Sequence, residues 1–205
     1  MILYTTVEKE AHVEQTIEKS RFIAHIYPVD SREEADGIIA SLRSQYKDAT
    51  HNVPALVLGD KQQLQWASDD GEPSGTSGAP MVRMLVSEGL TNVLVVVTRY
   101  FGGIKLGTGG LVRAYTSSAK LALDEAGRHD VKEYLAIRVR LEYTLLSKLQ
   151  SMERDLPYTI SSVDYTDKIE AQLVFAPEDE DLIMASLNQI SSGRVQILSS
   201  GKKIE

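Results

Sequence analysis

The sequence predicts an α+β protein of two domains, one over residues 1–130 and one over residues 131–205. Three observations favour this class. Segments in which apolar residues alternate, as in half-buried strands, are interleaved with segments whose apolar residues recur at helical spacing. A glycine ends a long helical segment near residue 130, where we place the boundary. With 205 residues, the chain is long enough for two small domains that each form a core.

The second domain has a simple order of elements. Strands are expected over residues 133–143, 158–165, 168–176 and 194–198. Helices are expected over residues 144–156 and 177–193, with Thr144 as the N-cap of the first and Gly193 closing the second. The apolar stripe of the second helix is expected to consist of Leu182, Ile183, Leu187 and Ile190. The resulting order, β-α-β-β-α-β, is that of the ferredoxin-like unit.

The first domain also mixes strands and helices. Strands are expected over residues 7–19, 22–29, 53–58, 63–67 and 92–100, and the first is polar enough to lie at an edge. Helices are expected over residues 31–46, 81–90 and 111–127, the first with a capping box at Ser31 and Glu34. The uniformly apolar segment 92–100 (NVLVVVTRY) predicts a strand buried on both faces. These elements predict an α/β sandwich, with residues 127–130 as the linker to the second domain.

Charge and composition limit the function. The net charge is −7, and both domains are acidic, so any phosphate-binding surface must be a local patch. The absence of cysteine excludes disulfides and thiolate metal sites, and fits a reducing compartment. The first residues lack a signal-peptide pattern, and the longest strongly apolar stretch is far shorter than the ~20 residues that span a bilayer. We therefore expect a cytoplasmic protein without a membrane partner or a cofactor.

A glycine-rich loop over residues 101–110 connects the buried strand to the helix that follows. It holds five of the 14 glycines, namely Gly102, Gly103, Gly107, Gly109 and Gly110. Glycine lets the backbone approach a ligand closely, and the first amides of the helix lack internal partners. The cations Arg99, Lys105 and Arg113 complete a predicted anion or nucleic-acid site. The spacing matches neither the P-loop nor the dinucleotide fingerprint, and a packing turn is the alternative.

A second loop over residues 68–80 (SDDGEPSGTSGAP) is acidic and rich in small residues. The candidates for a metal or partner contact in it are Asp69, Asp70, Glu72, Ser74 and Thr76. A nucleophile needs a positioned base, and His51 is the only nearby candidate by sequence, so we assign no catalytic and no metal-binding residue. A structural or partner-docking loop is the preferred interpretation. The alternative is that these carboxylates pair with Arg99, Lys105 or Arg113 across one site.

Four segments together resemble the signature of a known family. They are SRFIAH at residues 20–25, DATHNV at residues 48–53, the acidic loop, and NVLVVVTRYFGGIKLGTGGLVRAY from residue 92 onward. This combination is similar to the IMPACT family, in particular its bacterial YigZ- and YvyE-type members. The resemblance covers about residues 1–130, and the second domain resembles the small domain that follows in bacterial members.

The resemblance implies a fold and a function. The first domain is expected to share the fold of the second domain of a small-subunit ribosomal protein and of the fourth domain of elongation factor G. The second domain is expected to resemble the fifth domain of that factor. Both relatives touch ribosomal RNA, and eukaryotic members of the family regulate translation under stress. The family offers no accepted catalytic residues.

We therefore expect a translation-associated binding protein whose partner is the ribosome, RNA or a translation-related protein. Two alternatives remain at this point. One is an enzyme or binder that acts on a phosphorylated or nucleotide small molecule through Lys105 and the acidic loop. The other is a protein-interaction adaptor that docks through residues 68–80. The sequence does not indicate an oligomeric state.

Overall fold

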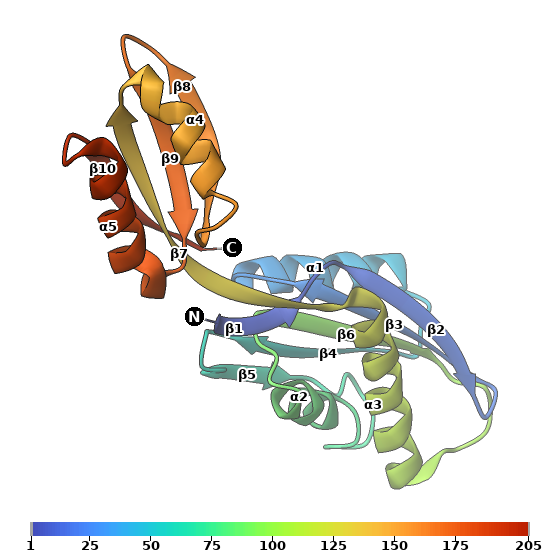
Figure 1. The fold of residues 1–205 in the computed structure, drawn as a ribbon. Coiled ribbons are helices and arrows are strands. Elements are labelled where there is room, and N and C mark those ends of the chain that lie inside the picture. The colour runs from blue at the N-terminus through green and yellow to red at the C-terminus, as the bar shows by residue number, and fades with distance from the viewer. Residues whose placement is uncertain (1, 205) are drawn as a thin grey trace. The chain divides into compact units, whose positions relative to one another are not determined.

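The computed structural model describes residues 2–204. It forms two compact units, one over residues 4–130 and one in which Ile2 and Leu3 join residues 131–204 (Figure 1). Each unit combines helices with an antiparallel sheet, which confirms the predicted α+β class. No helix within residues 2–204 is long and apolar enough to cross a membrane.

The sheet of the first unit has the order β2-β3-β6-β4-β5, and all its neighbours are antiparallel. Its strands are β2 (Ala11–Ile17), β3 (Ser20–Pro28), β6 (Val93–Tyr100), β4 (His51–Leu58) and β5 (Leu64–Ala67). The polar strand that the sequence predicts over residues 7–19 is β2, and it lies at the predicted edge. The chain before it forms a separate strand, β1 (Ile2–Val7), which the sequence analysis missed and which pairs with β7 (Arg128–Leu141).

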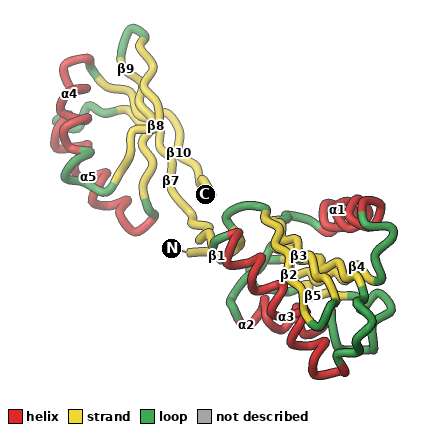
Figure 2. Tube along the Cα trace, turned by 90° about the vertical axis from the view of Figure 1, so that its right-hand side faces the viewer, coloured by secondary structure: helices red, strands yellow, loops and turns green. Residues whose placement is uncertain are grey.

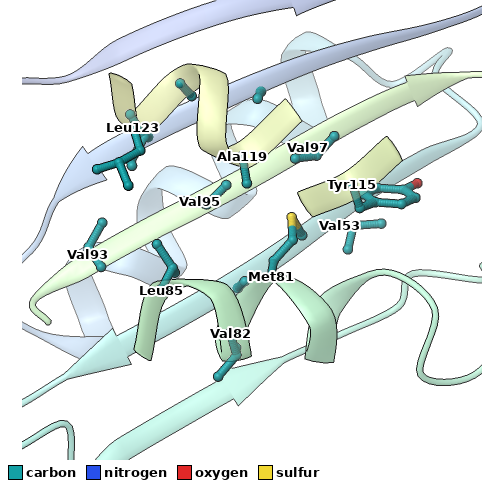
Figure 3. Close-up of a cluster of buried hydrophobic side chains, with 14 of the residues drawn as sticks. Val53, Met81, Val82, Leu85, Val93, Val95, Val97, Tyr115, Ala119 and Leu123 are labelled. Carbon is teal, nitrogen blue, oxygen red and sulfur yellow. The ribbon is translucent and has the colours of Figure 1, made fainter. Parts of the chain in front are cut away.

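Helices cover both faces of this sheet (Figure 1). Helix α1 (Arg32–Gln45) packs on one face, while α2 (Gly78–Ser87) and α3 (Gly107–Ala126) pack on the other. Alternate residues of the central strand β6 point to the two faces, so that Val95 meets α2 and α3 whereas Val96 meets α1. Figure 3 shows Leu85 of α2 and Ala119 of α3 over Val95. This arrangement confirms that β6 is buried on both faces, as its apolar sequence predicts.

The helix starts in this unit depart in part from the prediction. Ser31 caps α1 as expected, because its Oγ accepts a 3.1 Å hydrogen bond from the amide of Glu34. However, α2 begins at Gly78 rather than at residue 81, and α3 begins at Gly107 rather than at residue 111. Glycine disfavours helix by about 1 kcal/mol relative to alanine, so the apolar pattern alone places both starts too late. Gly107, Gly109 and Gly110 are therefore helical, and the loop is limited to residues 101–106.

The second unit has the predicted ferredoxin-like order of elements. After β7 come α4 (Tyr143–Met152), β8 (Tyr158–Tyr165), β9 (Ile169–Phe175), the 3-10 turn η1 (Pro177–Asp179), α5 (Glu180–Ser191) and β10 (Gln196–Ile204). The strands are ordered β10-β7-β9-β8. Both helices lie on one face of this sheet (Figure 2). There Leu149 and Leu187 meet apolar side chains of β7 and β9.

Three details of this unit differ from the sequence-based expectations. The N-cap of α4 is Glu142, whose backbone is extended, and Thr144 is already inside the helix. Leu182 is 49% exposed, so the apolar stripe of α5 consists of the buried Ile183 and Leu187 and the partly buried Ile190. The expected linker is strand, because β7 begins at residue 128, directly after the helix cap.

Candidate functional site

The course of the glycine-rich loop is set by close packing against the β2–β3 turn. A Cβ atom at Gly102 would lie 2.0 Å from the backbone carbonyl of Lys19, so this position accepts no side chain without a shift of the turn. The amide of Gly102 also donates a 3.2 Å hydrogen bond to Ser20 Oγ. Gly103 follows with φ +88° and open space around it. Close backbone packing therefore explains Gly102, which the sequence assigned to ligand approach.

Two of the predicted cations are exposed on this side of the unit. Lys105 lies in the loop and Arg113 lies in α3, and neither forms an ion pair with any residue that the structure describes. The N-cap position of α3 is held by Leu106, so within the described chain no side chain caps the first turn. Uncapped amides and the helix dipole make this end of α3 partly positive. The arrangement favours an anionic ligand.

The third predicted cation, Arg99, is buried rather than free. Its side chain is 5% exposed, and Nη1 donates a 2.6 Å hydrogen bond to Oε1 of Glu72. Nη2 donates to Ser20 Oγ at 3.3 Å, whereas Nε is buried with no hydrogen-bond partner among residues 2–204. The guanidinium carbon lies 5.4 Å from the ring centroids of both Phe22 and Phe101. Arg99 thus connects the end of β6 to the acidic loop, an arrangement that the sequence left open as an alternative.

Glu72 is the acceptor at the centre of this cluster. Tyr115 of α3 donates a 2.6 Å hydrogen bond to the same oxygen that binds Arg99. His51 Nε2 lies 3.7 Å from the other oxygen, and its Nδ1 lies 2.8 Å from the carbonyl oxygen of Asp70. Burial, reinforced by the neighbouring carboxylate, raises the pKa of Tyr115, so its hydroxyl remains a donor. Sequence reasoning missed Tyr115 because it reads as one more apolar position in a helix.

Asp69, Asp70 and Thr76, three of the other candidates in the acidic loop, have structural contacts. Asp69 accepts hydrogen bonds from the amides of Gly75, Ser77 and Gly78 and from Ser77 Oγ, and so caps α2. Burial acts to raise the pKa of Asp69, but these hydrogen bonds prevail and hold the pKa below its usual value.

Asp70 and Thr76 form hydrogen bonds within the first unit, whereas Ser74 is exposed. Asp70 accepts from the Asn52 amide at 2.6 Å and from Arg43 at 3.0 Å. Thr76 is buried and donates to the carbonyl of Pro73, while Ser74 is exposed. Within residues 2–204, no three His, Asp or Glu side chains meet in an arrangement that could hold a metal ion. Glu72 is therefore the carboxylate of the acidic loop that the fold places beside Arg99 and near Lys105.

Two cavities share lining residues at the glycine-rich loop. The first, which we call the loop cavity, has a volume of about 390 Å³ and is lined mainly by Glu72, Pro73, Arg99, Phe101, Lys105 and Leu111. The second, the hairpin cavity, has a volume of about 470 Å³ and includes Glu18, Lys105, Gly110 and Arg113. Lys105 lines both, so any ligand in either cavity meets its ammonium-bearing side chain. Gly107 borders the loop cavity, while Gly103 and Gly109 line neither of the two.

The chain is similar to known proteins over both units. Residues 18–123 match the Impact N-terminal domain, and residues 139–194 match a domain of unknown function (DUF1949). The chain is 36% identical over 194 residues to the IMPACT family member YvyE of Bacillus subtilis (strain 168), which covers 95% of this chain and 89% of that protein. It is 34% identical over 190 residues to the IMPACT family member YigZ of Escherichia coli (strain K12), covering 91% and 93%.

A solved structure is similar over the whole length. It is a crystal structure described as that of a hypothetical protein, with 33% sequence identity, 96% of each chain covered and a TM-score of 0.58. The motifs of both loops, the match to the Impact N-terminal domain over about half of the chain, and the near full-length relatives agree. The chain therefore belongs to the IMPACT family.

Proposed function

We propose that this protein acts in translation by binding RNA of the translation machinery through Lys105, Arg113 and the first turn of α3. The observation that carries the proposal is the pair of exposed cations, both without an ion-pair partner in the described chain, beside an uncapped helix end. Phosphate groups bind at such helix ends because the amides and the dipole both favour negative charge. Family membership supports the link to translation, since the resemblance implies RNA-contacting folds for both domains.

Two arginines on the sheet of the second unit are weaker candidates for the phosphate contact than the cations of the glycine-rich loop and α3. On its sheet, Arg138 and Arg140 both pair with Glu170, and Arg138 also pairs with Asp164. The hydrogen bond from Arg140, with that from Arg138, lowers the pKa of Glu170, so the carboxylate stays charged. Cations that are already neutralised contribute less to phosphate binding than Lys105 and Arg113 do.

The overall charge of −7 predicts binding through few contacts. Each neutralised phosphate lowers the logarithm of the binding constant by roughly 0.7–0.9 per decade of salt. Two cations therefore predict a shallow salt dependence, with a slope of about −1.4 to −1.8. A protein that coats RNA through many cations has a much steeper slope.

The test is co-sedimentation of the purified protein with ribosomes on gradients at low and moderate salt. We expect salt-sensitive co-migration that is lost in Lys105→Glu. The matched control is Lys61→Glu, which makes the same charge change at an exposed lysine in the turn after β4, near Asn92 and so at the opposite end of β6. Absence of the wild-type protein from ribosomal fractions at both salts, or equal losses in the two variants, would contradict the proposal.

A further inference from the structure

The loop cavity has features that a phosphate contact alone does not use. Phe101, at its rim, is 46% exposed although it is a large aromatic side chain. Pro73, Leu106 and Leu111 contribute apolar walls. The volume of about 390 Å³ falls in the roughly 300–1,000 Å³ range of small-molecule sites. The cavity is therefore large enough for a flat organic group, and its surface is suited to one.

The charged pair that lines the cavity retains unused hydrogen-bonding positions. Glu72 Oε1 accepts from Arg99 and Tyr115, whereas Oε2 lies 3.7 Å from His51 Nε2 and accepts no hydrogen bond from the residues that the structure describes. On the same pair, Arg99 Nε is buried and unpartnered within residues 2–204. Native proteins seldom leave buried polar atoms unsatisfied. Arg99 Nε has less than 1 Å² of accessible surface, so a ligand in the cavity does not reach this donor. The pair instead places a polar, mutually neutralised patch in the cavity wall, which fits the polar edge of a planar ring.

The charges that line the loop cavity indicate which part of a ligand is uncharged and which part is anionic. Glu72 and Arg99 neutralise each other, so the part of a ligand beside this pair should carry no net charge. Lys105 and the first turn of α3 lie along the same cavity and have no carboxylate partner in the described chain. This part favours an anion. The ligand therefore has a flat, uncharged polar body joined to an anionic group.

We propose that the loop cavity binds one nucleotide unit, with its base against Phe101 and its phosphate at Lys105. A nucleobase is planar, apolar on its faces and polar along its edge, and proteins hold unpaired bases by stacking them on aromatic side chains. The same unit occurs in a free nucleotide and in an unpaired residue of RNA. For RNA, the inference rests on the proposed function, because the bound nucleotide would belong to the strand whose phosphates contact Lys105 and Arg113.

The experiment titrates the full-length chain with the four ribonucleoside 5′-monophosphates and with a single-stranded RNA hexamer. A hexamer of the same length without bases separates base contacts from phosphate contacts. Phe101→Leu keeps an apolar side chain but removes the ring, and Phe101→Tyr retains the ring. Lys105→Glu tests the phosphate contact, and Lys61→Glu is its control with the same change of charge. Phe101 is about half exposed, so the Phe101 variants should fold. Thermal melts monitored by circular dichroism check the folding of every variant.

We expect Phe101→Leu to weaken binding of base-containing ligands by roughly tenfold or more, with recovery in Phe101→Tyr. Binding of the base-free hexamer should not respond to Phe101 but should be lost in Lys105→Glu. Equal binding of both hexamers, with no effect of Phe101→Leu on any ligand, overturns this inference and leaves the proposed function intact. Phe101-dependent binding of monophosphates without ribosome or RNA binding supports the nucleotide site and overturns the proposed function. Binding of no ligand overturns the nucleotide site, and overturns the proposed function as well only when the protein is also absent from ribosomal fractions.

Discussion

The carboxylate of Glu72 and the guanidinium of Arg99 form a buried ion pair between positions 27 residues apart, with 2.6 Å between Oε1 and Nη1. The side chains are 3% and 5% exposed. Tyr115 donates to the same oxygen, so one carboxylate joins the acidic loop, the end of β6 and helix α3. The pair holds together the elements that line the loop cavity.

Replacing Glu72 by glutamine should strongly destabilise the protein. Arg99 would then be a buried charge without a counter-ion, which costs about 3–5 kcal/mol when one partner of a buried pair is removed. The free energy of unfolding, measured by urea titration, gives the size of the loss. Asp36→Asn is the control, because Asp36 pairs with Arg32 on the surface of α1 and such pairs contribute about 0.5 kcal/mol. A similar, small loss in both variants would contradict the role of the pair.

Two glycines of the basic segment should respond to alanine with opposite signs. Gly102→Ala places a Cβ about where the Lys19 carbonyl lies, at 2.0 Å, and should cost about 1–3 kcal/mol or more. Gly109 is helical, and the nearest atom to a Cβ there is Arg113 Nη1 at 3.8 Å. Gly109→Ala should therefore stabilise α3 by up to about 1 kcal/mol. Thermal unfolding of the two variants checks the signs, and stabilisation by Gly102→Ala would show that the loop does not need this close approach.

Gly102 and Gly109 show which part of the site can be predicted from the sequence. The composition indicated where the glycine-rich, basic residues 99–113 lie, but it assigned both glycines to close approach of a ligand. One is fixed by contact with a turn 82 residues earlier, as the hydrogen bond from Gly102 to Ser20 shows, and no local pattern encodes that contact. The other lies in a helical turn that glycine propensity disfavours, and packing of α3 on the sheet overrides this propensity.

The fold was more predictable than the site for a related reason. Residues 93–97 of strand β6 are all apolar, and this local property alone implies burial on both faces. The site depends on Glu72, Arg99 and Tyr115, which come from a loop, a strand and a helix. Sequence could offer the carboxylate–arginine pairing only as an alternative, and the tyrosine is concealed in the apolar stripe of α3.

Removing the Asp69 carboxylate should loosen the acidic loop and the start of α2. Asp69→Ala deletes the acceptor for three amides and one hydroxyl, and loss of a helix cap typically costs about 0.5–2 kcal/mol. Ser74→Ala, at an exposed position of the same loop, should leave stability unchanged. Hydrogen exchange of the α2 amides reports the local effect, and equal protection in the two variants would argue against the cap.

The stability of the first unit should fall as the pH drops below about 6.5, because of His25. This side chain of β3 is 5% exposed, and its Nε2 is buried without a hydrogen-bond partner in the described chain. His12 and Tyr46 pack against its ring at centroid distances of 6.0 and 5.3 Å. Burial, aided by the charge of His12, lowers the pKa of His25 to about 4 from an ordinary 6.5.

The sign of this effect follows from proton linkage. Between pH 6.5 and about 4 the unfolded chain binds a proton at His25 that the folded chain does not, so protonation favours unfolding. The stabilisation by neutral His25 is complete above pH 6.5 and is lost as the pH approaches 4. His25→Phe should flatten the decline in unfolding free energy between pH 7 and 5, whereas His129→Gln, at an exposed position, should not. Urea titrations at pH 7, 6 and 5 measure the slope. Parallel curves for the wild type and His25→Phe would mean that another group sets the acid sensitivity.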